Sequence, residues 1–126
     1  MLGQTILIAD DAVFMRTMLR QIIEDMDWSV VGEAADGREA IAQYRKLQPD
    51  LVLLDITMPT LDGNEALKNI LAEDPRAQVV MITALGQKDQ VLEAIKTGAR
   101  DFIIKPFDQD RVTETLQGIL CPGPAA

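Results

Sequence analysis

The chain has 126 residues, 48% of them hydrophobic and 25% charged, a composition typical of a domain that buries one core. Its 12 basic residues against 20 acidic ones give a net charge of -8, which disfavours nonspecific binding to nucleic acid or to anionic membranes. The chain has no histidine, so histidine-ligated zinc, Ser-His or Cys-His nucleophile pairs and phosphohistidine are excluded. Carboxylate and lysine chemistry remains, and we expect no nucleic-acid partner.

The cysteine content and the apolar segments predict where the protein works. Cys121 is the single cysteine and cannot form an internal disulfide. The N-terminus has no basic segment leading into a long apolar region, and no apolar run approaches the length needed to span a bilayer. We therefore expect a cytoplasmic protein without membrane insertion.

Strand and helix patterns alternate along the first part of the chain. An apolar run from Thr5 to Ala9 predicts the first strand. Apolar residues at helical spacing between Met15 and Met26 predict the first helix, with its methionines in the core. Ser29 to Ala34 is then expected to form a short second strand. A second helix should run from Arg38 to about Leu47, because Pro49 ends it.

The middle of the chain repeats this alternation. The apolar run Leu51 to Leu54 predicts a third strand. It is followed by a loop over residues 57–63, in which Pro59 and the pair Asp62-Gly63 are turn formers. A third helix is expected after this loop and should end at Pro75.

Two further strand and helix pairs are predicted in the last part of the chain. Gln78 to Ile82 predicts the fourth strand, and a helix is expected over Lys88 to Thr97 with Gly98 as its stop. Asp101 to Ile104 predicts the fifth strand, and the fifth helix should run from about Asp110 to Leu120. On the fourth helix, the apolar residues expected to face the core are Val91, Leu92 and Ile95.

The alternation predicts an α/β fold. Strands that alternate with helices of this length form a parallel sheet with right-handed crossovers and helices on both faces. We expect a single doubly wound domain with a five-stranded parallel sheet and five helices. No repeat, low-complexity tract or linker is visible, so one domain is assigned to residues 1–126. Its core should cover about 4–120, followed by a short tail at 121–126 in which Pro122-Gly123-Pro124 forbids further helix.

Chemically capable residues follow four of the predicted strands. Asp10 and Asp11 follow the first strand, and Asp55 follows the third. Thr83 follows the fourth strand and Lys105 the fifth. Because the carboxyl ends of parallel strands meet at one edge of the sheet, we expect these side chains to lie together.

The acidic residues at this edge predict a metal site. Three carboxylates that lie close together repel one another, which raises their proton affinity and favours a bound cation. Mg2+ prefers oxygen ligands in octahedral geometry, which fits Asp11 and Asp55 as direct ligands and Asp10 through water. Calcium fits less well because the chain has no dense carboxylate loop. The expected cofactor is therefore Mg2+.

The same residues predict phosphoryl chemistry. With the metal bound, Asp55 would attack a phosphoryl group in line and form an aspartyl phosphate. Phosphoryl transfer requires mainly alignment and positive charge near the nonbridging oxygens, which Lys105 and Mg2+ would supply. Thr83, with the backbone amide of Ala84, would donate hydrogen bonds to those oxygens. The predicted catalytic residues are therefore Asp55, Lys105 and Thr83.

Each of these residues also has an ordinary structural explanation. Aspartates after a strand often cap the next helix, a lysine is commonly a solvated surface charge, and Thr83 would suit a helix cap or a turn. Independent caps would have no reason to fall on the same edge of one sheet. We therefore favour the functional interpretation.

Other classes of function fit the sequence less well. A flavin carrier of similar topology would need a Ser/Thr-rich phosphate loop and aromatic residues around the ring, but this chain has an acidic loop and 4% aromatics. A Mg2+-dependent aspartyl phosphatase of the haloacid-dehalogenase type would need a second Asp two residues after the nucleophile, where this chain has Thr57. An interaction module with a dead site would have lost Asp11, Asp55 or Lys105.

Together, these motifs resemble the receiver domain of bacterial response regulators. The similarity covers about residues 4–120, and within the family it is strongest to the stand-alone chemotaxis regulators. The strand order 2-1-3-4-5 of a flavodoxin-like fold is implied by this resemblance and not by the sequence pattern, since these regulators are themselves an example of that order. The motifs are Asp10-Asp11-Ala12-Val13-Phe14-Met15-Arg16, Gly32-Glu33-Ala34, Asp55-Ile56-Thr57-Met58-Pro59, Thr83-Ala84 and Lys105-Pro106-Phe107.

The resemblance implies a phosphorylation-activated switch in a two-component system. A histidine kinase would phosphorylate Asp55, and the downstream partner would be a flagellar switch protein or another protein, with a phosphatase as a further partner. The backbone carbonyl of Thr57 would be an additional metal ligand, and Phe102 would be a switch residue whose ring moves with the Thr83 hydroxyl. The protein would catalyse only its own phosphorylation and dephosphorylation. An intermediate receiver of a multistep phosphorelay is the alternative, because it would share every catalytic residue.

Overall fold

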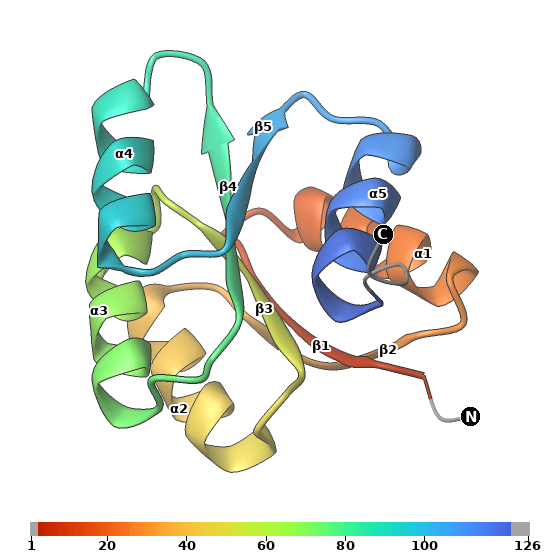
Figure 1. Ribbon diagram of the computed structural model, residues 1–126, viewed down its shortest axis with the longest axis horizontal. Coiled ribbons are helices and arrows are strands. Elements are labelled where there is room, and N and C mark those ends of the chain that lie inside the picture. Colours follow the sequence, from red (N-terminus) through yellow and green to blue (C-terminus); the bar gives the residue numbers. More distant parts are fainter. Residues whose placement is uncertain (1–2, 122–126) are drawn as a thin grey trace, which may run out of the picture.

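The computed structural model describes residues 3–121, which form a sheet of five parallel strands with helices on both faces (Figure 1). The strand order β2-β1-β3-β4-β5 confirms the doubly wound α/β fold and the order taken from the family resemblance. The strands are β1 (Thr5–Ala9), β2 (Ser29–Ala34), β3 (Leu51–Asp55), β4 (Val79–Ala84) and β5 (Asp101–Lys105). The helices are α1 (Val13–Asp25), α2 (Gly37–Leu47), α3 (Gly63–Glu73), α4 (Lys88–Thr97) and α5 (Gln109–Leu120).

Three strands extend further toward their carboxyl ends than the apolar runs predict. β3 includes Asp55, β4 continues through Thr83 to Ala84, and β5 includes Lys105. Backbone pairing explains the extension, because Asp55 pairs with Ile82 and Ala84 with Lys105 in the parallel ladder. The side chains of Asp55, Thr83 and Lys105 therefore project from paired strand residues and not from the loops that follow.

A hydrophobic layer covers each face of the sheet. Figure 1 shows α2, α3 and α4 on one face and α1 and α5 on the other, and the two clusters of buried residues divide in the same way. Residues of β3 alternate between them, since Leu51 and Leu53 pack with α1 and α5 while Val52 and Leu54 pack with the other helices. A central strand covered on both faces is therefore apolar without interruption.

Aspartate caps begin three of the described helices. Asp62 is therefore more than a turn former, because it caps α3, while Gly63 is the first residue of that helix. The capping hydrogen bonds run to Asp36 from the Glu39 N–H at 2.8 Å, to Asp62 from the Glu65 N–H at 2.9 Å and to Asp108 from the Arg111 N–H at 2.8 Å.

α4 buries a narrower face than the sequence predicts. Val91 and Ala94 are buried, whereas Leu92 and Ile95, which were expected to face the core, are 49% and 40% exposed. Helical spacing shows which residues share a face, but tertiary packing decides how much of that face is covered. Because α4 lies beside β5 at the edge of the described sheet, this part of the helix lines an open groove.

The methionines of α1 are also less buried than expected. The buried residues of the helix are Leu19, Ile22 and Ile23, and Met15 and Met18 are only half-buried. The branched aliphatic residues therefore supply most of the contact between α1 and the sheet.

The two ends of the chain lie outside the described residues. These include the part of the expected tail after Cys121, with its Pro122-Gly123-Pro124 stop. Within residues 3–121, no helix is both long enough and apolar enough to cross a membrane.

Candidate functional site

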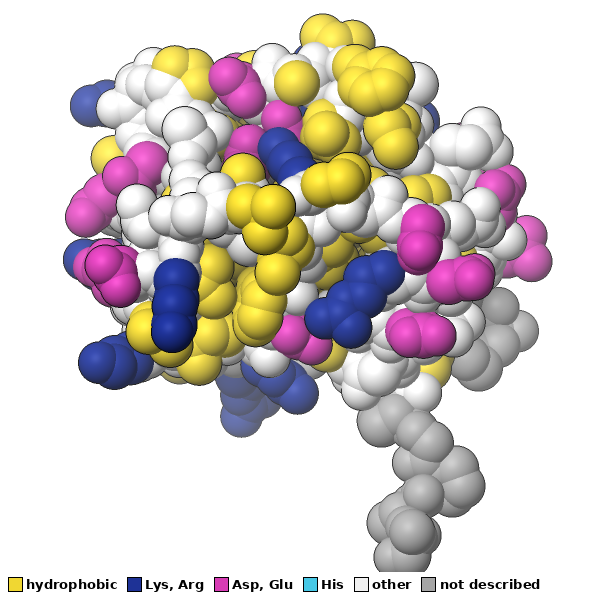
Figure 2. Space-filling model, turned by 90° about the horizontal axis from the view of Figure 1, so that it is seen from above, with side chains coloured by type: hydrophobic (Ala, Val, Ile, Leu, Met, Phe, Trp, Pro, Cys, Tyr) yellow, Lys and Arg dark blue, Asp and Glu magenta, His cyan; other side chains and the backbone are white. Residues whose placement is uncertain are grey.

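The carboxyl ends of β1, β3 and β5 bring three charged side chains into contact. Lys105 Nζ lies 3.0 Å from Asp10 Oδ2 and 3.2 Å from Asp55 Oδ2. Asp10 is fully buried and Asp55 is 6% exposed, so both carboxylates meet the lysine largely away from water. Figure 2, which looks onto this end of the sheet, shows acidic and basic side chains lying among hydrophobic ones. The predicted cluster of Asp10, Asp55 and Lys105 is present.

Hydrogen bonds to both its side chain and its backbone fix Asp10. Its Oδ1 accepts the Ala12 N–H at 2.9 Å, and its carbonyl oxygen accepts from Arg16 Nη1 at 2.7 Å. Arg16 Nε in turn donates to Glu33 at 2.8 Å. Because charge-assisted hydrogen bonds are short and directional, the loop between β1 and α1 holds Asp10 in one orientation.

Burial and neighbouring charge raise the pKa of Asp55 to about 6. Desolvation is the largest cause and the charge of Asp10 is the next, while Lys105 lowers the pKa and offsets only part of this rise. Burial lowers the pKa of Lys105, but the hydrogen bond that Lys105 donates to Asp10 and the charges of both carboxylates raise it above its ordinary value. The lysine is therefore charged at neutral pH, and ionised Asp55 remains incompletely compensated.

A third carboxylate completes a group that fits a metal ion. Asp10, Asp11 and Asp55 each offer one oxygen, and these oxygens lie within 4.8 Å of one another. Asp11 is exposed, so the group opens to solvent. Oxygen ligands favour a hard cation such as Mg2+, and a cation would relieve the unfavourable burial of charge that raises the pKa of Asp55.

Thr57 lies directly beside this group. Its N–H donates to Asp55 Oδ1 at 3.4 Å, and its side chain is exposed. The backbone of Thr57 is thus adjacent to the carboxylate that it was expected to assist, while its role as a carbonyl ligand stays a prediction.

Close packing behind Asp55 requires a glycine. A Cβ atom at Gly63 would lie 2.1 Å from the Asp55 carbonyl oxygen and 2.8 Å from Ile56 Cα. The Gly63 N–H also donates to the Ile56 carbonyl oxygen at 2.7 Å. Because glycine has no Cβ, the start of α3 can pack directly onto the end of β3 and hold the backbone of Asp55 in place.

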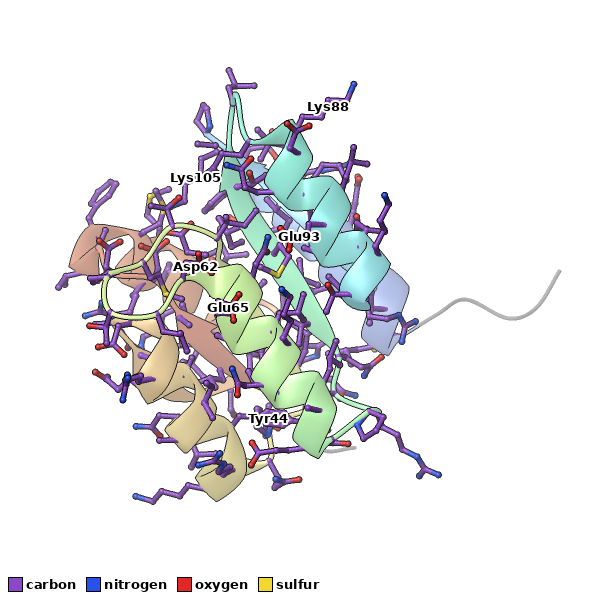
Figure 3. The ribbon with its side chains drawn as sticks, turned by 90° about the vertical axis from the view of Figure 1, so that its left-hand side faces the viewer. Tyr44, Asp62, Glu65, Lys88, Glu93 and Lys105 are labelled. Carbon is purple, nitrogen blue, oxygen red and sulfur yellow. The ribbon has the colours of Figure 1, made fainter. Side chains whose placement is uncertain are left out.

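α3 and α4 run side by side, and both begin at the end of the sheet where Lys105 lies, as Figure 3 shows. Lys68 Nζ on α3 lies 3.5 Å from Glu65 and 3.4 Å from Glu93 on α4. The Asn64 side chain donates to the carbonyl oxygen of Gln90 at 3.0 Å. These contacts join the two helices close to the candidate site.

Thr83 and Phe102 lie at a groove between α4 and β5. Thr83 is buried, and its hydroxyl donates to Gln87 Oε1 at 2.9 Å. Phe102 is half-buried and packs against the hydrophobic layer of α2, α3 and α4. The groove has a volume of about 370 Å³, and its apolar walls include Leu85, Val91, Leu92, Ile95 and Ile104.

Comparison with known proteins identifies the family. Residues 6–117 match the family described as the response regulator receiver domain. The chain belongs to this family. The receiver motifs at the strand ends are therefore confirmed as a family resemblance, and they occupy the geometry described above.

Relatives of this receiver include chemotaxis proteins. It is 55% identical to the chemotaxis protein CheY of Listeria monocytogenes over 112 residues, which cover 89% of this chain and 94% of the relative. It is 49% identical to CheY of Thermotoga maritima over 118 residues, which cover 94% and 98%. Among solved structures, a CheX-CheY-BeF3-Mg+2 complex from Borrelia burgdorferi matches with a TM-score of 0.89 and 39% identity, covering 92% of this chain and 88% of that one.

The ordinary structural explanations do not account for the site of this receiver. α1 has no side-chain capping hydrogen bond, and the N-cap of α4 is Gln87, so capping explains neither the Asp10-Asp11 pair nor Thr83. The side chain of Lys105 is only 22% exposed and contacts two carboxylates, unlike a solvated surface charge.

Sequence reasoning missed three residues around the receiver site. Arg16 and Glu33 support Asp10, and Gln87 hydrogen-bonds Thr83. Arg16 and Glu33 carry opposite charges in the quoted family motifs, which is a weak signal for a pair. Gln87 has no comparable signal, because it follows no strand directly and has no partner of opposite charge.

Proposed function

We propose that this receiver is a phosphorylation-activated switch of the CheY type, in which Asp55 accepts a phosphoryl group from a histidine kinase. The observation that carries the proposal is the contact of Lys105 Nζ with both Asp10 and Asp55 beside a group of three carboxylates. A nucleophile, a cation for the phosphoryl oxygens and oxygen ligands for a metal thus meet at one edge of the sheet.

In the proposed reaction, an oxygen of Asp55 attacks the phosphorus of a phosphohistidine on the kinase. A P–O bond forms as the P–N bond breaks, and the imidazole leaves with the bonding electron pair. With a pKa of about 6, Asp55 is mostly ionised at neutral pH and can act as the nucleophile. Lys105 balances charge on the nonbridging oxygens, and Thr83 and the Ala84 N–H donate hydrogen bonds to them.

Asp10, Asp11 and Asp55 would hold Mg2+, with the carbonyl oxygen of Thr57 as a further ligand. When bound, the ion supplies positive charge beside the carboxylates and the incoming phosphoryl group. Both oxygens of Asp10 already accept hydrogen bonds, from Ala12 and Lys105. The hydrogen bonds to Asp55 are longer, at 3.4 Å from the Thr57 N–H and 3.2 Å from Lys105, and Asp11 is exposed. Asp11 and Asp55 would therefore be the direct ligands, and Asp10 a ligand through water.

The names of the relatives support chemotaxis as the pathway. A kinase would act upstream, and a flagellar switch protein or another downstream protein would bind the face formed by α4, β5 and α5. The receiver would act in the cytoplasm as one domain over residues 1–126. It would turn over only its own phosphoryl group, and Thr57 argues against a phosphatase of small substrates because it stands where such an enzyme needs an acid.

Acetyl phosphate with Mg2+ tests this function without a kinase. Intact-mass spectrometry should show one phosphoryl group per chain that is labile to base, absent in Asp55→Asn and retained in Asp89→Asn, which changes an exposed aspartate on α4. Removal of Mg2+ with a chelator should prevent the modification. A stoichiometric adduct in Asp55→Asn would show that Asp55 is not the acceptor.

A further inference from the structure

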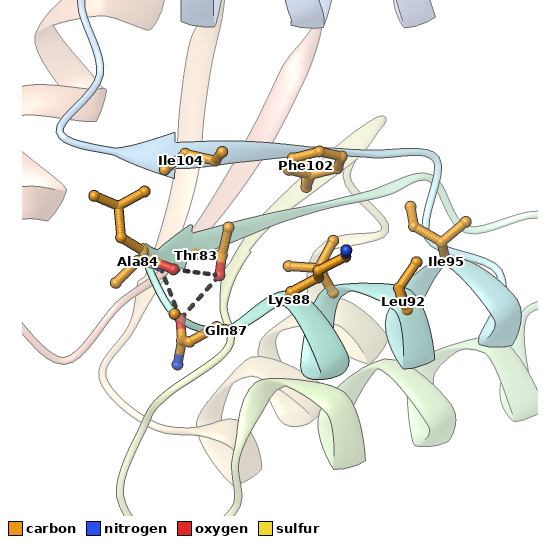
Figure 4. Close-up of a pocket in the computed structure, with 11 residues that line it drawn as sticks. Thr83, Ala84, Gln87, Lys88, Leu92, Ile95, Phe102 and Ile104 are labelled. Carbon is orange, nitrogen blue, oxygen red and sulfur yellow. Dashed lines mark hydrogen bonds between the residues drawn. The ribbon is translucent and has the colours of Figure 1, made fainter.

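One amide side chain joins the two loops that flank Asp55. Gln87 Oε1 accepts the Thr83 hydroxyl at 2.9 Å and the Ala84 N–H at 2.8 Å, as the dashed lines in Figure 4 show. Gln87 Nε2 donates to Thr57 Oγ1 at 2.7 Å. The amide therefore links the end of β4 to the residue whose N–H faces Asp55 Oδ1. All three hydrogen bonds are of ordinary length for strong contacts.

These hydrogen bonds do not serve the helix that Gln87 begins. Gln87 occupies the N-cap of α4, yet its side chain makes no capping hydrogen bond. Glutamine is not among the preferred N-cap residues, and α2, α3 and α5 use aspartates for this purpose. The Gln87 side chain is therefore directed toward the candidate site, and its loss would remove no cap.

The two donors that Gln87 occupies are those assigned above to the phosphoryl oxygens. The Thr83 hydroxyl and the Ala84 N–H each carry a single hydrogen, and Gln87 Oε1 is an acceptor for both. The Thr83 hydroxyl also lies 3.3 Å from the Ala84 carbonyl oxygen, a longer contact than the 2.9 Å to Gln87. Neither donor can form a full hydrogen bond to Gln87 and to a phosphoryl oxygen at the same time. A phosphoryl group at Asp55 that uses both donors must therefore displace the Gln87 amide.

We propose that Gln87 is a positioning residue that takes the place of the phosphoryl oxygen in the unphosphorylated receiver and is displaced by it. The inference rests on the proposed function of Asp55. The amide oxygen satisfies Thr83 and Ala84 without adding negative charge beside the carboxylates, whereas a glutamate there would repel them. Hydrogen bonds to a charged phosphoryl oxygen are stronger than those to a neutral amide oxygen, so the phosphoryl group displaces Gln87. The free energy of phosphoryl binding is reduced by the hydrogen bonds of Gln87 that are broken in this exchange.

Displacement of Gln87 also changes the groove. Thr83, Ala84 and Gln87 line it together with Phe102, so the same event frees Thr57, the end of β4 and the start of α4. Gln87 therefore links the arrival of the phosphoryl group to the surface between α4 and β5. It stabilises the unphosphorylated arrangement and lowers the affinity of the site for a phosphoryl group.

The test measures binding of beryllium fluoride, a phosphoryl mimic, by NMR titration in Mg2+. Gln87→Met removes the amide but keeps the side-chain length, and Gln90→Met makes the same change at an exposed position one turn along α4. We expect Gln87→Met to bind the mimic about tenfold more tightly than the wild type, and Gln90→Met to bind like the wild type. Before any mimic is added, the Ala84 amide should exchange faster with solvent in Gln87→Met alone.

The outcomes separate this inference from the proposed function. If the wild type does not bind the mimic at Asp55, both the proposed function and the inference fail. If the wild type binds and a folded Gln87→Met binds equally or more weakly, only the inference fails, because Gln87 then does not compete with the phosphoryl group. Unchanged exchange of the Ala84 amide in Gln87→Met would likewise contradict the contact on which the inference depends.

Discussion

The charged cluster and the apolar groove differ in how completely their side chains are in contact with other groups of the protein. In the cluster of Asp10, Asp55 and Lys105, the lysine contacts both carboxylates within 3.2 Å, and backbone N–H groups reach the other two oxygens within 3.4 Å. In the groove between α4 and β5, Leu92 and Ile104 are 49% and 41% exposed around a volume of about 370 Å³. The cluster is fixed by its contacts, whereas the groove is left open.

The charged cluster and the groove are therefore suited to different functions. A site that stabilises a phosphoryl group acts best when its charges are already positioned, because no reorganisation is then needed. An exposed apolar groove can repack or be covered by a partner. Thr83 and Gln87 belong to both regions, since they line the groove and hydrogen-bond at the edge of the site.

Replacement of Lys105 should have the largest effect on the function of the charged cluster. We expect Lys105→Met to slow phosphorylation by acetyl phosphate on the order of 100-fold, because the phosphoryl oxygens lose their side-chain cation. The time course of intact mass gives the rate, and Lys88→Met, at an exposed lysine on α4, is the control. A rate in Lys105→Met close to that of the control would show that this cation does not assist the transfer.

A pair of leucine truncations compares the filled core with the groove. Leu67 on α3 is fully buried, so Leu67→Ala should lower the free energy of unfolding by about 3 kcal/mol. Leu92 is 49% exposed, so Leu92→Ala should cost less than about 1 kcal/mol. Urea denaturation measures both values. Similar losses would mean that the groove is packed as tightly as the core.

The pKa of Asp55 predicts a pH-dependent gain of stability in Asp55→Asn. The pKa of Asp55 is raised to about 6, above the ordinary value of about 3.9 expected in the unfolded chain. The contribution of Asp55 to the stability of the folded wild type is therefore fully present below a pH of about 4 and is lost as the pH rises through about 6. Without Mg2+, the free energy of unfolding of Asp55→Asn relative to that of the wild type should therefore rise by about 2 kcal/mol as the pH rises from about 4 to about 6.

Thermal unfolding at several pH values measures this gain. Glu114→Gln, at an exposed glutamate on α5, serves as the control and should show no comparable dependence. If the difference between Asp55→Asn and the wild type were the same at pH values on both sides of this window, burial would not raise the pKa of Asp55.

The charged cluster could be predicted from the sequence because residues that follow parallel strands lie at the same edge of the sheet. Once Asp10, Asp55 and Lys105 were assigned to the ends of parallel strands, their meeting at one sheet edge followed from the geometry of such sheets. The order of the strands did not follow in this way and came from the family resemblance. The contacts between the side chains then matched the expectation.

The groove and Gln87 could not be predicted by the same reasoning. Helical spacing placed Leu92 and Ile95 on the face of Val91, but their exposure depends on α4 lying beside an edge strand. The hydrogen bond from Gln87 to Thr57 joins residues 30 positions apart through one side-chain rotamer. Local patterns contain no information about such a contact.

If charge at Asp55 reaches the groove through Thr83, removal of the Thr83 hydroxyl should uncouple the two regions, and NMR of Thr83→Ala measures this coupling. We expect Thr83→Ala to be phosphorylated on Asp55 still, but the phosphorylation-dependent shifts at Phe102 and over residues 84–92 should be strongly reduced relative to the wild type. Full shifts on this face in phosphorylated Thr83→Ala would contradict the route through Thr83, while the assignment of Asp55 as acceptor would stand.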